Sequence, residues 1–163
     1  MLNAFGLPHI SNADKAAAEA HRVLKPGGRF AYASWCVASA CIGFSMVYDA
    51  VRAHGSLDVG LPPGPIFFGY GDPHYAREML GCAGFSEVSV KEVPLVWRAA
   101  DPDAVIEGIS RGTARAAAVF NRQSPNNLVK IKQHMRDRIS QFRENGAYAV
   151  PSPAVVVAGR KPG

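Results

Sequence analysis

The sequence has few of the features that mark a secreted, membrane-spanning or metal-binding protein. Its 163 residues include three cysteines and no CxxC pair, so neither a disulfide framework nor a metal site is predicted, and the thiols are expected to be reduced and buried. No apolar run approaches the roughly 20 residues that cross a bilayer, and the first residues lack the basic start and apolar core of a signal peptide. These absences predict a cytoplasmic protein without a membrane span.

Charge is unevenly distributed along the chain. Residues 1–110 carry 8 Lys and Arg against 11 Asp and Glu, whereas residues 111–163 carry 10 against 2, which gives the formal net charge of +5. Such a basic segment could attract a phosphate, a nucleic acid or an anionic membrane. Its basic residues are spread over several predicted helices and are not interleaved with aromatic residues for base stacking. We therefore favour a solvated helical face and do not expect a nucleic-acid partner.

The first 35 residues have the pattern of a helix, a tight turn and a buried strand. Small polar residues at Ser11 and Asn12 precede an apolar stripe and predict a helix start. This helix is expected to end at Lys25, because the following Pro-Gly-Gly disfavours helix and permits the chain to reverse. Residues 29–35 are apolar on both alternate faces, which predicts a strand covered by helices on each side. This order is typical of an α/β fold.

The middle of the chain continues the alternation of helices, loops and strands. A second helix is predicted over residues 40–53, and a surface loop rich in Gly and Pro over residues 54–71. The aromatic side chains that end this loop pack either on the body of the domain or around a ligand. A helix started by proline follows, and then residues 85–97 alternate as an edge strand does, with Pro94 inside the run.

The last third is predicted to be helical until a final strand. Three helices are expected within residues 101–145, and the longest, beginning at Ser124, has apolar residues at steps of three and four. Residues 154–159 are β-branched and apolar on both faces, which favours a central strand rather than an edge strand. Residues 101–145 therefore form a helical insertion before the last strand.

Several runs of residues resemble a known family. Residues 3–10 (NAFGLPHI) and 19–30 (EAHRVLKPGGRF), together with Gly71-Asp72-Pro73, residues 80–85 (LGCAGF) and the last strand, resemble the class I S-adenosylmethionine-dependent methyltransferases of the methyltransferase type 11 kind. The resemblance covers essentially the whole chain. It implies a partial Rossmann-like methyltransferase sheet, in which the seventh strand is antiparallel and lies between the fifth and the sixth. In this arrangement residues 30–35 would be the fifth strand, residues 85–97 the sixth and residues 154–159 the seventh. Residues 1–3 would be a tail of the fourth strand.

The residues that bind the cofactor in that family are not found in this sequence. The family holds S-adenosylmethionine on a glycine-rich turn after its first strand and on an acidic residue after its second. No GxGxxG occurs here, and Gly69-Tyr70-Gly71 precedes a proline-started helix, so it is interpreted as a loop-to-helix joint. We therefore expect residues 1–163 to be a single C-terminal half of a methyltransferase domain, inactive and unable to bind the cofactor tightly by itself.

The resemblance also implies which residues would remain of the active site. In the family, the loop corresponding to residues 3–10 lies beside the transferable methyl group and the substrate. Asn3 and Phe5 are therefore candidates for cofactor binding. His9 is a candidate general base, since methyl transfer requires alignment of the acceptor and sometimes removal of a proton. A lone histidine near the start of a chain is, however, more often a solvated or structural group.

The missing half creates a physical problem at the strand 30–35. Without a fourth strand beside it, this strand would present unpaired backbone groups, and such edges pair readily with another chain. We therefore expect a homo-oligomer, such as a dimer, or a complementary chain at this strand.

Three functions are compatible with the sequence. The chain is part of a longer methyltransferase that acts on a small-molecule acceptor, or it is a half-domain that works with a complementary chain or as a rearranged dimer. Alternatively, it is a non-catalytic binding or oligomerisation module that uses the fold's basic region or its aromatic loop.

Overall fold

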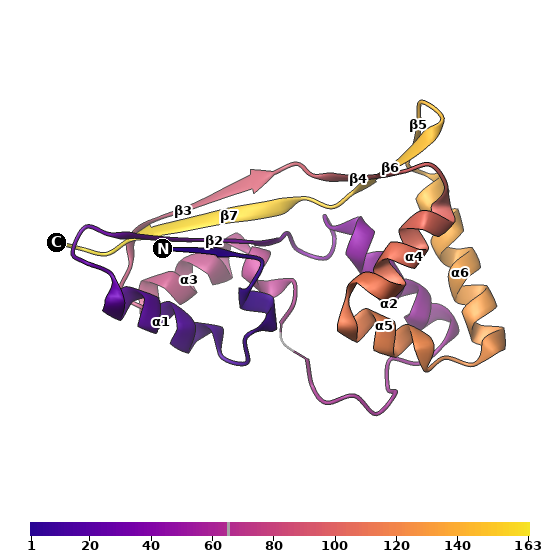
Figure 1. The fold of residues 1–163 in the computed structure, drawn as a ribbon, viewed down its shortest axis with the longest axis horizontal. Helices are drawn as coiled ribbons and strands as arrows, with labels where there is room; N and C mark the ends of the chain where they lie inside the picture. The colour runs from indigo at the N-terminus through magenta and orange to yellow at the C-terminus, as the bar shows by residue number, and fades with distance from the viewer. Residues whose placement is uncertain (65) are drawn as a thin grey trace. The chain divides into compact units, whose positions relative to one another are not determined.

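The computed structural model describes residues 1–64 and 66–163, so one residue of the predicted loop 54–71, Pro65, lies outside the described residues. The chain divides into two compact units, each assembled from distant segments. Unit 1 comprises Met1–Val37, Pro65–Pro94 and Pro153–Gly163, and unit 2 comprises Ala38–Gly64 and Leu95–Ser152. Figure 1 shows the elements of both units with their labels.

Unit 1 is built on a four-stranded sheet in the order β1-β2-β7-β3. Its strands are β1 (Leu2–Ala4), β2 (Arg29–Trp35), β7 (Ala154–Arg160) and β3 (Ser86–Val93). β1 is parallel to β2, whereas β7 is antiparallel to both β2 and β3. The expected partial methyltransferase sheet is therefore confirmed, with the last strand of the chain in the middle of the sheet and β3 at its edge.

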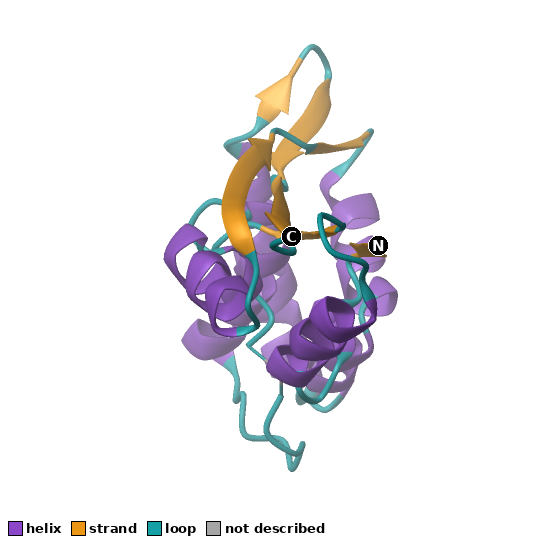
Figure 2. Ribbon diagram, turned by 90° about the vertical axis from the view of Figure 1, so that its left-hand side faces the viewer, coloured by secondary structure: helices purple, strands orange, loops and turns teal. Residues whose placement is uncertain are grey.

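Two helices cover one face of this sheet. α1 (Ala13–Val23) and α3 (Pro73–Cys82) lie on the same side of the strands (Figures 1 and 2). The side chains of Phe30, Tyr32 and Val157 point to that side and are buried. Hydrophobic burial of this kind contributes the main driving force for folding.

The opposite face of the sheet is apolar but only partly covered. Residues that are directly opposite one another in the register share a face, and the intervening positions of β1, β2 and β7 form what we name the open face: Leu2, Ala4, Ala31, Ala33, Val156 and Ala158. The exposed fraction is 85% for Leu2 and 40% for Val156. The predicted cover by helices on both sides of β2 is therefore not found within the described residues of unit 1.

The edge of the sheet also differs from the sequence-based expectation. Strand 30–35 is not unpaired, because Leu2 and Ala4 of β1 lie opposite Ala31 and Ala33 of β2. The Phe5 N–H extends this pairing by donating to the Ala33 carbonyl at 3.0 Å. The short β1 occupies that side of β2, so the free edge of the sheet is that of β1.

The predicted strand 85–97 is in fact two strands in different sheets. β3 ends at Val93, and β4 (Val96–Ala99) begins a second sheet in the order β4-β6-β5. Pro94 lies between them and has no N–H for a strand ladder, which is the physical reason for the interruption.

Unit 2 packs four helices around an apolar core. These are α2 (Ile42–His54), α4 (Pro102–Gly112), α5 (Ala114–Asn121) and α6 (Pro125–Ser140). Ser124 caps α6, and the predicted stripe is confirmed, since Ile131, Met135 and Ile139 are fully buried. The hairpin of β5 (Arg143–Glu144) and β6 (Ala147–Pro151) was not predicted.

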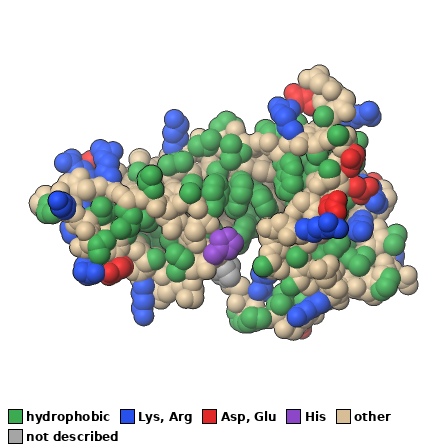
Figure 3. All heavy atoms as spheres, viewed as in Figure 1, with side chains coloured by type: hydrophobic (Ala, Val, Ile, Leu, Met, Phe, Trp, Pro, Cys, Tyr) green, Lys and Arg blue, Asp and Glu red, His purple; other side chains and the backbone are tan. Residues whose placement is uncertain are grey.

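The basic residues of unit 2 are partly neutralised by acidic neighbours. Arg136 contacts Asp103 at 2.7 Å, and Arg111 contacts Glu107 at 2.9 Å. Figure 3 shows acidic and basic side chains interspersed over α4 and α6. Exposed pairs of this kind contribute little to stability, typically up to about 1 kcal/mol.

Two expectations about exposed and buried groups can be compared directly with the structure. Cys36 and Cys41 are buried as predicted, but Cys82 is exposed at the end of α3, so its prediction as a buried residue is wrong. Among the described residues, the helices lack the length and apolar character needed to span a bilayer.

Candidate functional site

The candidate site lies where the loops after β1 and β2 leave the sheet. β1 and β2 are parallel, so their carboxyl ends meet at the same edge of the sheet, which is where ligands bind in open α/β folds. β1 ends at Ala4 and β2 at Trp35. The ring of Phe5, which follows β1, lies 4.6 Å from the ring of Trp35 with a tilt of 37°. The two rings form an aromatic wall at this edge.

Asn3 organises the loop that follows β1. Its Oδ1 accepts hydrogen bonds from the backbone N–H groups of Gly6 at 2.9 Å and Leu7 at 3.1 Å. A Cβ on residue 6 would lie 2.8 Å from the same oxygen, so the close approach requires glycine. The side-chain amide oxygen of Asn3 is therefore hydrogen-bonded to the backbone of its own loop.

Phe5 adopts an unusual backbone conformation. Its φ of +54° lies in the left-handed region, which non-glycine residues seldom occupy. The Phe5 N–H bond to β2 and the contact with Trp35 hold this conformation. Strained residues that the surroundings hold in place are concentrated at functional sites.

His9 ends a short 3₁₀ turn, η1 (Leu7–His9), and is exposed. Leu7 and Pro8 are buried and anchor this turn to the body of unit 1. The His9 ring lies 6.4 Å from the ring of Phe67 in an edge-to-face arrangement. An exposed imidazole at this position can exchange a proton with a bound molecule or with water.

Three aromatic residues of the site were not among the candidate site residues: Trp35, which ends the predicted strand 29–35, and Phe67 and Tyr70, which end the predicted loop 54–71. Gly71, in the 3₁₀ turn η2 (Gly69–Gly71), packs directly on the end of β2, because an added Cβ would overlap the Trp35 carbonyl oxygen. The Tyr32 hydroxyl donates a hydrogen bond to the Tyr70 carbonyl at 3.1 Å, and this bond links η2 to β2 of the sheet. Burial raises the pKa of the Tyr32 phenol, so this group stays a hydrogen-bond donor. The signal that could have found Trp35 is its position at the carboxyl end of a strand.

The surroundings of Cys36, which directly follows Trp35, favour the neutral thiol. Burial and, less strongly, the charge of Glu92 raise the pKa of the Cys36 thiol. A raised pKa keeps the group as a thiol, and the thiolate is the reactive form.

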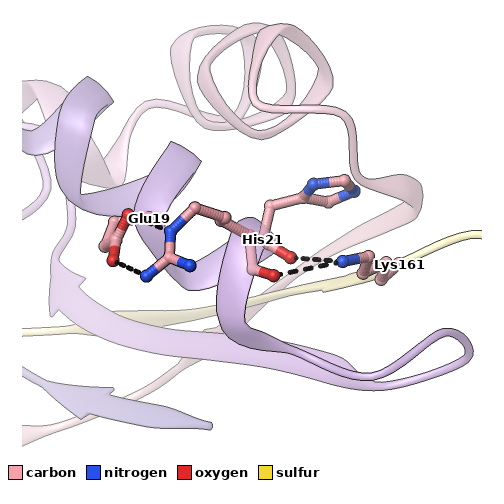
Figure 4. Close-up of polar contacts among 4 residues, drawn as sticks. Glu19, His21 and Lys161 are labelled. Atoms are coloured by element: carbon pink, nitrogen blue, oxygen red, sulfur yellow. Dashed lines mark hydrogen bonds and ion pairs between the residues drawn. The ribbon is translucent and has the colours of Figure 1, made fainter.

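The residues that carry the family resemblance most specifically, 19–30, have a structural role. The carbonyls of His21 and Leu24 accept hydrogen bonds from the Lys161 Nζ at 2.8 and 2.9 Å, which places a positive charge at the C-terminal end of α1. Figure 4 shows the contact of Lys161 with His21 beside the ion pair of Glu19 and Arg22. The motif therefore fixes the joint between α1, β2 and the last residues of the chain.

Comparisons with known proteins agree with this arrangement. No family model matches the chain. The crystal structure of the YcgJ protein of Bacillus subtilis superposes with a TM-score of 0.53 and 16% identity, covering 99% of this chain and 64% of that protein. The chain has an α/β fold with a partial Rossmann-like methyltransferase sheet. A phosphoethanolamine N-methyltransferase of Haemonchus contortus superposes with a TM-score of 0.47 and 16% identity over 99% of this chain.

One curated methyltransferase shares a segment of sequence with this methyltransferase-like chain. The mitochondrial 2-methoxy-6-polyprenyl-1,4-benzoquinol methylase of the rat is 48% identical over 46 residues. That segment is 28% of this chain and 11% of the rat protein, so the chain spans only a small part of this relative and 33% of the Haemonchus protein.

The residues at the site fit one end of S-adenosylmethionine. The sulfonium of this cofactor is a cation, and aromatic faces such as those of Phe5 and Trp35 attract cations. The loop offers neither a carboxylate for ribose hydroxyls nor a glycine-rich turn. Within the loop 3–10 and the end of β2, the site therefore offers aromatic faces that suit a cation but no carboxylate for a ribose.

Proposed function

We propose that this chain is part of an S-adenosylmethionine-dependent methyltransferase that acts on a small molecule. It would form the part of the active site that lies beside the transferable methyl group and the methyl acceptor. The observation that carries the proposal is the aromatic wall of Phe5 and Trp35 at the carboxyl ends of two parallel strands, in a sheet with the strand order of that fold. The cofactor supplies the methyl group. Phe5 and Trp35 face its sulfonium, and His9 removes a proton from the acceptor.

The strain at Phe5 suits this role because it keeps the ring at the edge of the sheet without reorganisation during the reaction. Pre-positioned groups lower the barrier by holding the reactants in a near-attack geometry. Asn3 supports the same arrangement indirectly, since its hydrogen bonds to Gly6 and Leu7 fix the loop between Phe5 and His9. We assign Asn3 a positioning role and keep Phe5 as the candidate contact to the cofactor.

The proposal includes completion of the sheet by further strands beside β1. The free edge of β1 has only three residues, and its side chains are continuous with the open face. A cavity of about 250 Å³ lies beside β1 and α1, lined mainly by apolar residues that include Leu2, Ala20 and Val23. The free edge of β1, the open face and this cavity all include Leu2 and are largely apolar. Such surfaces favour packing against a further polypeptide segment.

Binding of S-adenosylhomocysteine tests this function. Isothermal titration would compare the 163-residue chain with the same chain extended by the reading frame upstream of Met1 or mixed with a complementary chain. We expect tight binding only after completion, and about tenfold weaker binding in the Phe5→Ala variant because an aromatic face is lost. His74→Gln is the control, since this histidine is exposed on α3. Equal affinity of Phe5→Ala and the completed wild type would contradict the assignment.

His9 is tested by methyl transfer rather than by binding. In the completed enzyme with a panel of oxygen, nitrogen and carbon acceptors, His9→Gln should reduce turnover by about 100-fold or more and leave S-adenosylhomocysteine affinity unchanged. Unchanged turnover with every acceptor that the wild type methylates would remove His9 from the mechanism.

The alternative function is a non-catalytic module that associates through the same surface. The specific observation in its favour is the open face, where Leu2 is 85% exposed. Sedimentation velocity over a concentration series should show self-association that Leu2→Lys abolishes. Val129→Lys is the matched control, because Val129 is an exposed apolar residue on α6 of unit 2 and is not part of the open face. A monodisperse monomer at all concentrations would exclude the homo-oligomer and leave a complementary chain as the partner.

A further inference from the structure

Two histidines that are 80 residues apart in the sequence meet in unit 2. The Nε2 atom of His54, the last residue of α2, lies 3.1 Å from the Nδ1 atom of His134 on α6. The two rings are inclined by 70°, with centroids 5.2 Å apart, and both side chains are partly buried. One imidazole donates its N–H to the lone pair of the other, so neither nitrogen faces bulk water alone.

The pair lines a groove on the surface of unit 2. This groove has a volume of about 410 Å³ and is lined by His54, Lys130, Gln133, His134, Asp137, Arg138 and Gln141. Asp137 follows His134 by three positions, so both side chains project from the same face of α6. The Asp137 carboxylate accepts a hydrogen bond from Gln133 at 2.8 Å, which orients it within the groove.

We propose that His54 and His134 together bind a divalent transition-metal ion, with zinc as the reference ion. Imidazole nitrogen is a preferred ligand of such ions, and Zn–N bonds are about 2.0–2.1 Å long. Two nitrogens 3.1 Å apart then subtend about 98° at the metal, close to the angle between neighbouring ligands in tetrahedral or octahedral sites. The ion would lie about 1.3 Å to one side of the line between the two nitrogens, and the hydrogen bond between them would be replaced by the two metal–nitrogen bonds.

The proton balance of this exchange is simple. The imidazole that donates the hydrogen bond moves its proton to its outer ring nitrogen and stays neutral, so both inner nitrogens present lone pairs to the metal. Water molecules complete the coordination. Asp137 lies one turn further along α6 and can approach the ion through one of these waters.

The charges around the pair set the strength of the site. The C-terminal end of α2, at His54, carries partial negative charge and favours a cation. Lys130 and Arg138 oppose it, although the Arg138 guanidinium donates to Gln141 at 2.5 Å and lies over the ring of Phe142. Among the described residues no cluster of three or more His, Cys, Asp or Glu side chains is suited to a metal ion, so the protein supplies two direct ligands. We therefore expect micromolar rather than nanomolar affinity.

Metal binding here would link α2 to α6. The pair is formed only in the folded chain, because the two residues are far apart in the sequence. An ion that binds the native state stabilises it in proportion to the logarithm of its concentration relative to Kd. His54 and His134 belong to unit 2, and none of the residues assigned to methyl transfer lines their groove, so the proposal stands independently of methyl transfer.

Zinc titration of the intact chain tests the proposal. Isothermal titration with ZnCl₂ at pH 7.5 should give one site per chain, and zinc should raise the melting temperature whereas MgCl₂ should not. His54→Gln and His134→Gln should each weaken zinc binding at least tenfold, and His74→Gln, at an exposed histidine, should not. Affinity should fall between pH 7.5 and pH 5.5, because protonated imidazoles do not bind metals.

A spectroscopic readout keeps the test independent of folding. Cobalt(II) bound in the wild type should give visible absorption that zinc displaces, and circular dichroism should show that both glutamine variants fold. Zinc binding of equal affinity in either variant would overturn the proposal. The absence of zinc and cobalt binding in the folded wild type would overturn it equally.

Discussion

Replacement of Asn3 by alanine separates a positioning role from a ligand-binding role. Asn3 Oδ1 accepts two backbone hydrogen bonds, at 2.9 and 3.1 Å, and each contributes about 1 kcal/mol net when the groups are partly buried. Asn3→Ala should therefore lower the free energy of unfolding of unit 1 by about 1–2 kcal/mol. Asn3→Asp keeps an acceptor in the same place, so it should stay within about 0.5 kcal/mol of the wild type.

Urea unfolding measures this difference. The chain has two tryptophans, one in each unit, so a Trp97→Phe background leaves Trp35 fluorescence as a reporter beside Phe5. Hydrogen exchange at the Gly6 and Leu7 amides should accelerate in Asn3→Ala. The reasoning is refuted by an unchanged unfolding curve in Asn3→Ala, or by an Asn3→Asp variant that loses as much stability as the alanine variant.

Three further predictions concern the elements that hold the site. Gly71→Ala should cost about 3 kcal/mol or more by overpacking against the end of β2, whereas Gly81→Ala, with open space around it, should be neutral or stabilising. Burial raises the pKa of Tyr32, so unit 1 should lose stability as pH rises above about 10, and Tyr32→Phe should lessen that loss. The Asp72 carboxylate accepts hydrogen bonds from the backbone N–H groups of Tyr75, the larger effect, and of His74, and these bonds lower its pKa. The stability that Asp72 gives to α3 should therefore be present above about pH 4 and be lost below it.

Each of these predictions has a direct measurement. Thermal or urea unfolding compares the two glycine variants, and equal losses would contradict the close approach at residue 71. Absorbance during alkaline titration should show Tyr32 ionising only as unit 1 unfolds. Carboxyl chemical shifts should place the Asp72 titration below that of an unstructured aspartate, and an Asp72→Asn variant should lack the corresponding acid dependence. A normal titration of either group would refute its assignment.

Much of the fold could be predicted because its elements carry strong local signals. The Pro-Gly-Gly turn after residue 25 and the cap-then-proline starts of α3, α4 and α6 set element boundaries within the chain itself. The run from Ala154 to Gly159 is apolar on both faces, and the structure places it in the centre of the sheet. The separation of β3 from β4 could not be predicted so well, since Pro94 in an alternating run is equally compatible with one edge strand.

The site was harder to predict than the fold. The loop 3–10 was recognised by resemblance, yet the role of Asn3 in bonding its own loop depends on a chain reversal that residue types do not specify. Trp35 joins the site because the pairing of β1 with β2 brings Phe5 beside it, and Phe67 joins it through the contact with His9. The contact between His54 and His134 has no signal at all in sequence spacing, because two separate helices must pack before the nitrogens meet.

The sequence by itself determined the order of the main helices and of the strands of the first sheet, the apolar faces and the resemblance to methyltransferases. Local propensity and periodicity suffice for those features, since they depend on residues a few positions apart. Only the tertiary structure decided that β1 takes the edge of β2, that one face of the sheet stays open, and that two histidines share a groove. Those features arise from pairing and packing between segments distant in the chain, where the geometry is set by the whole core rather than by any local run of residues.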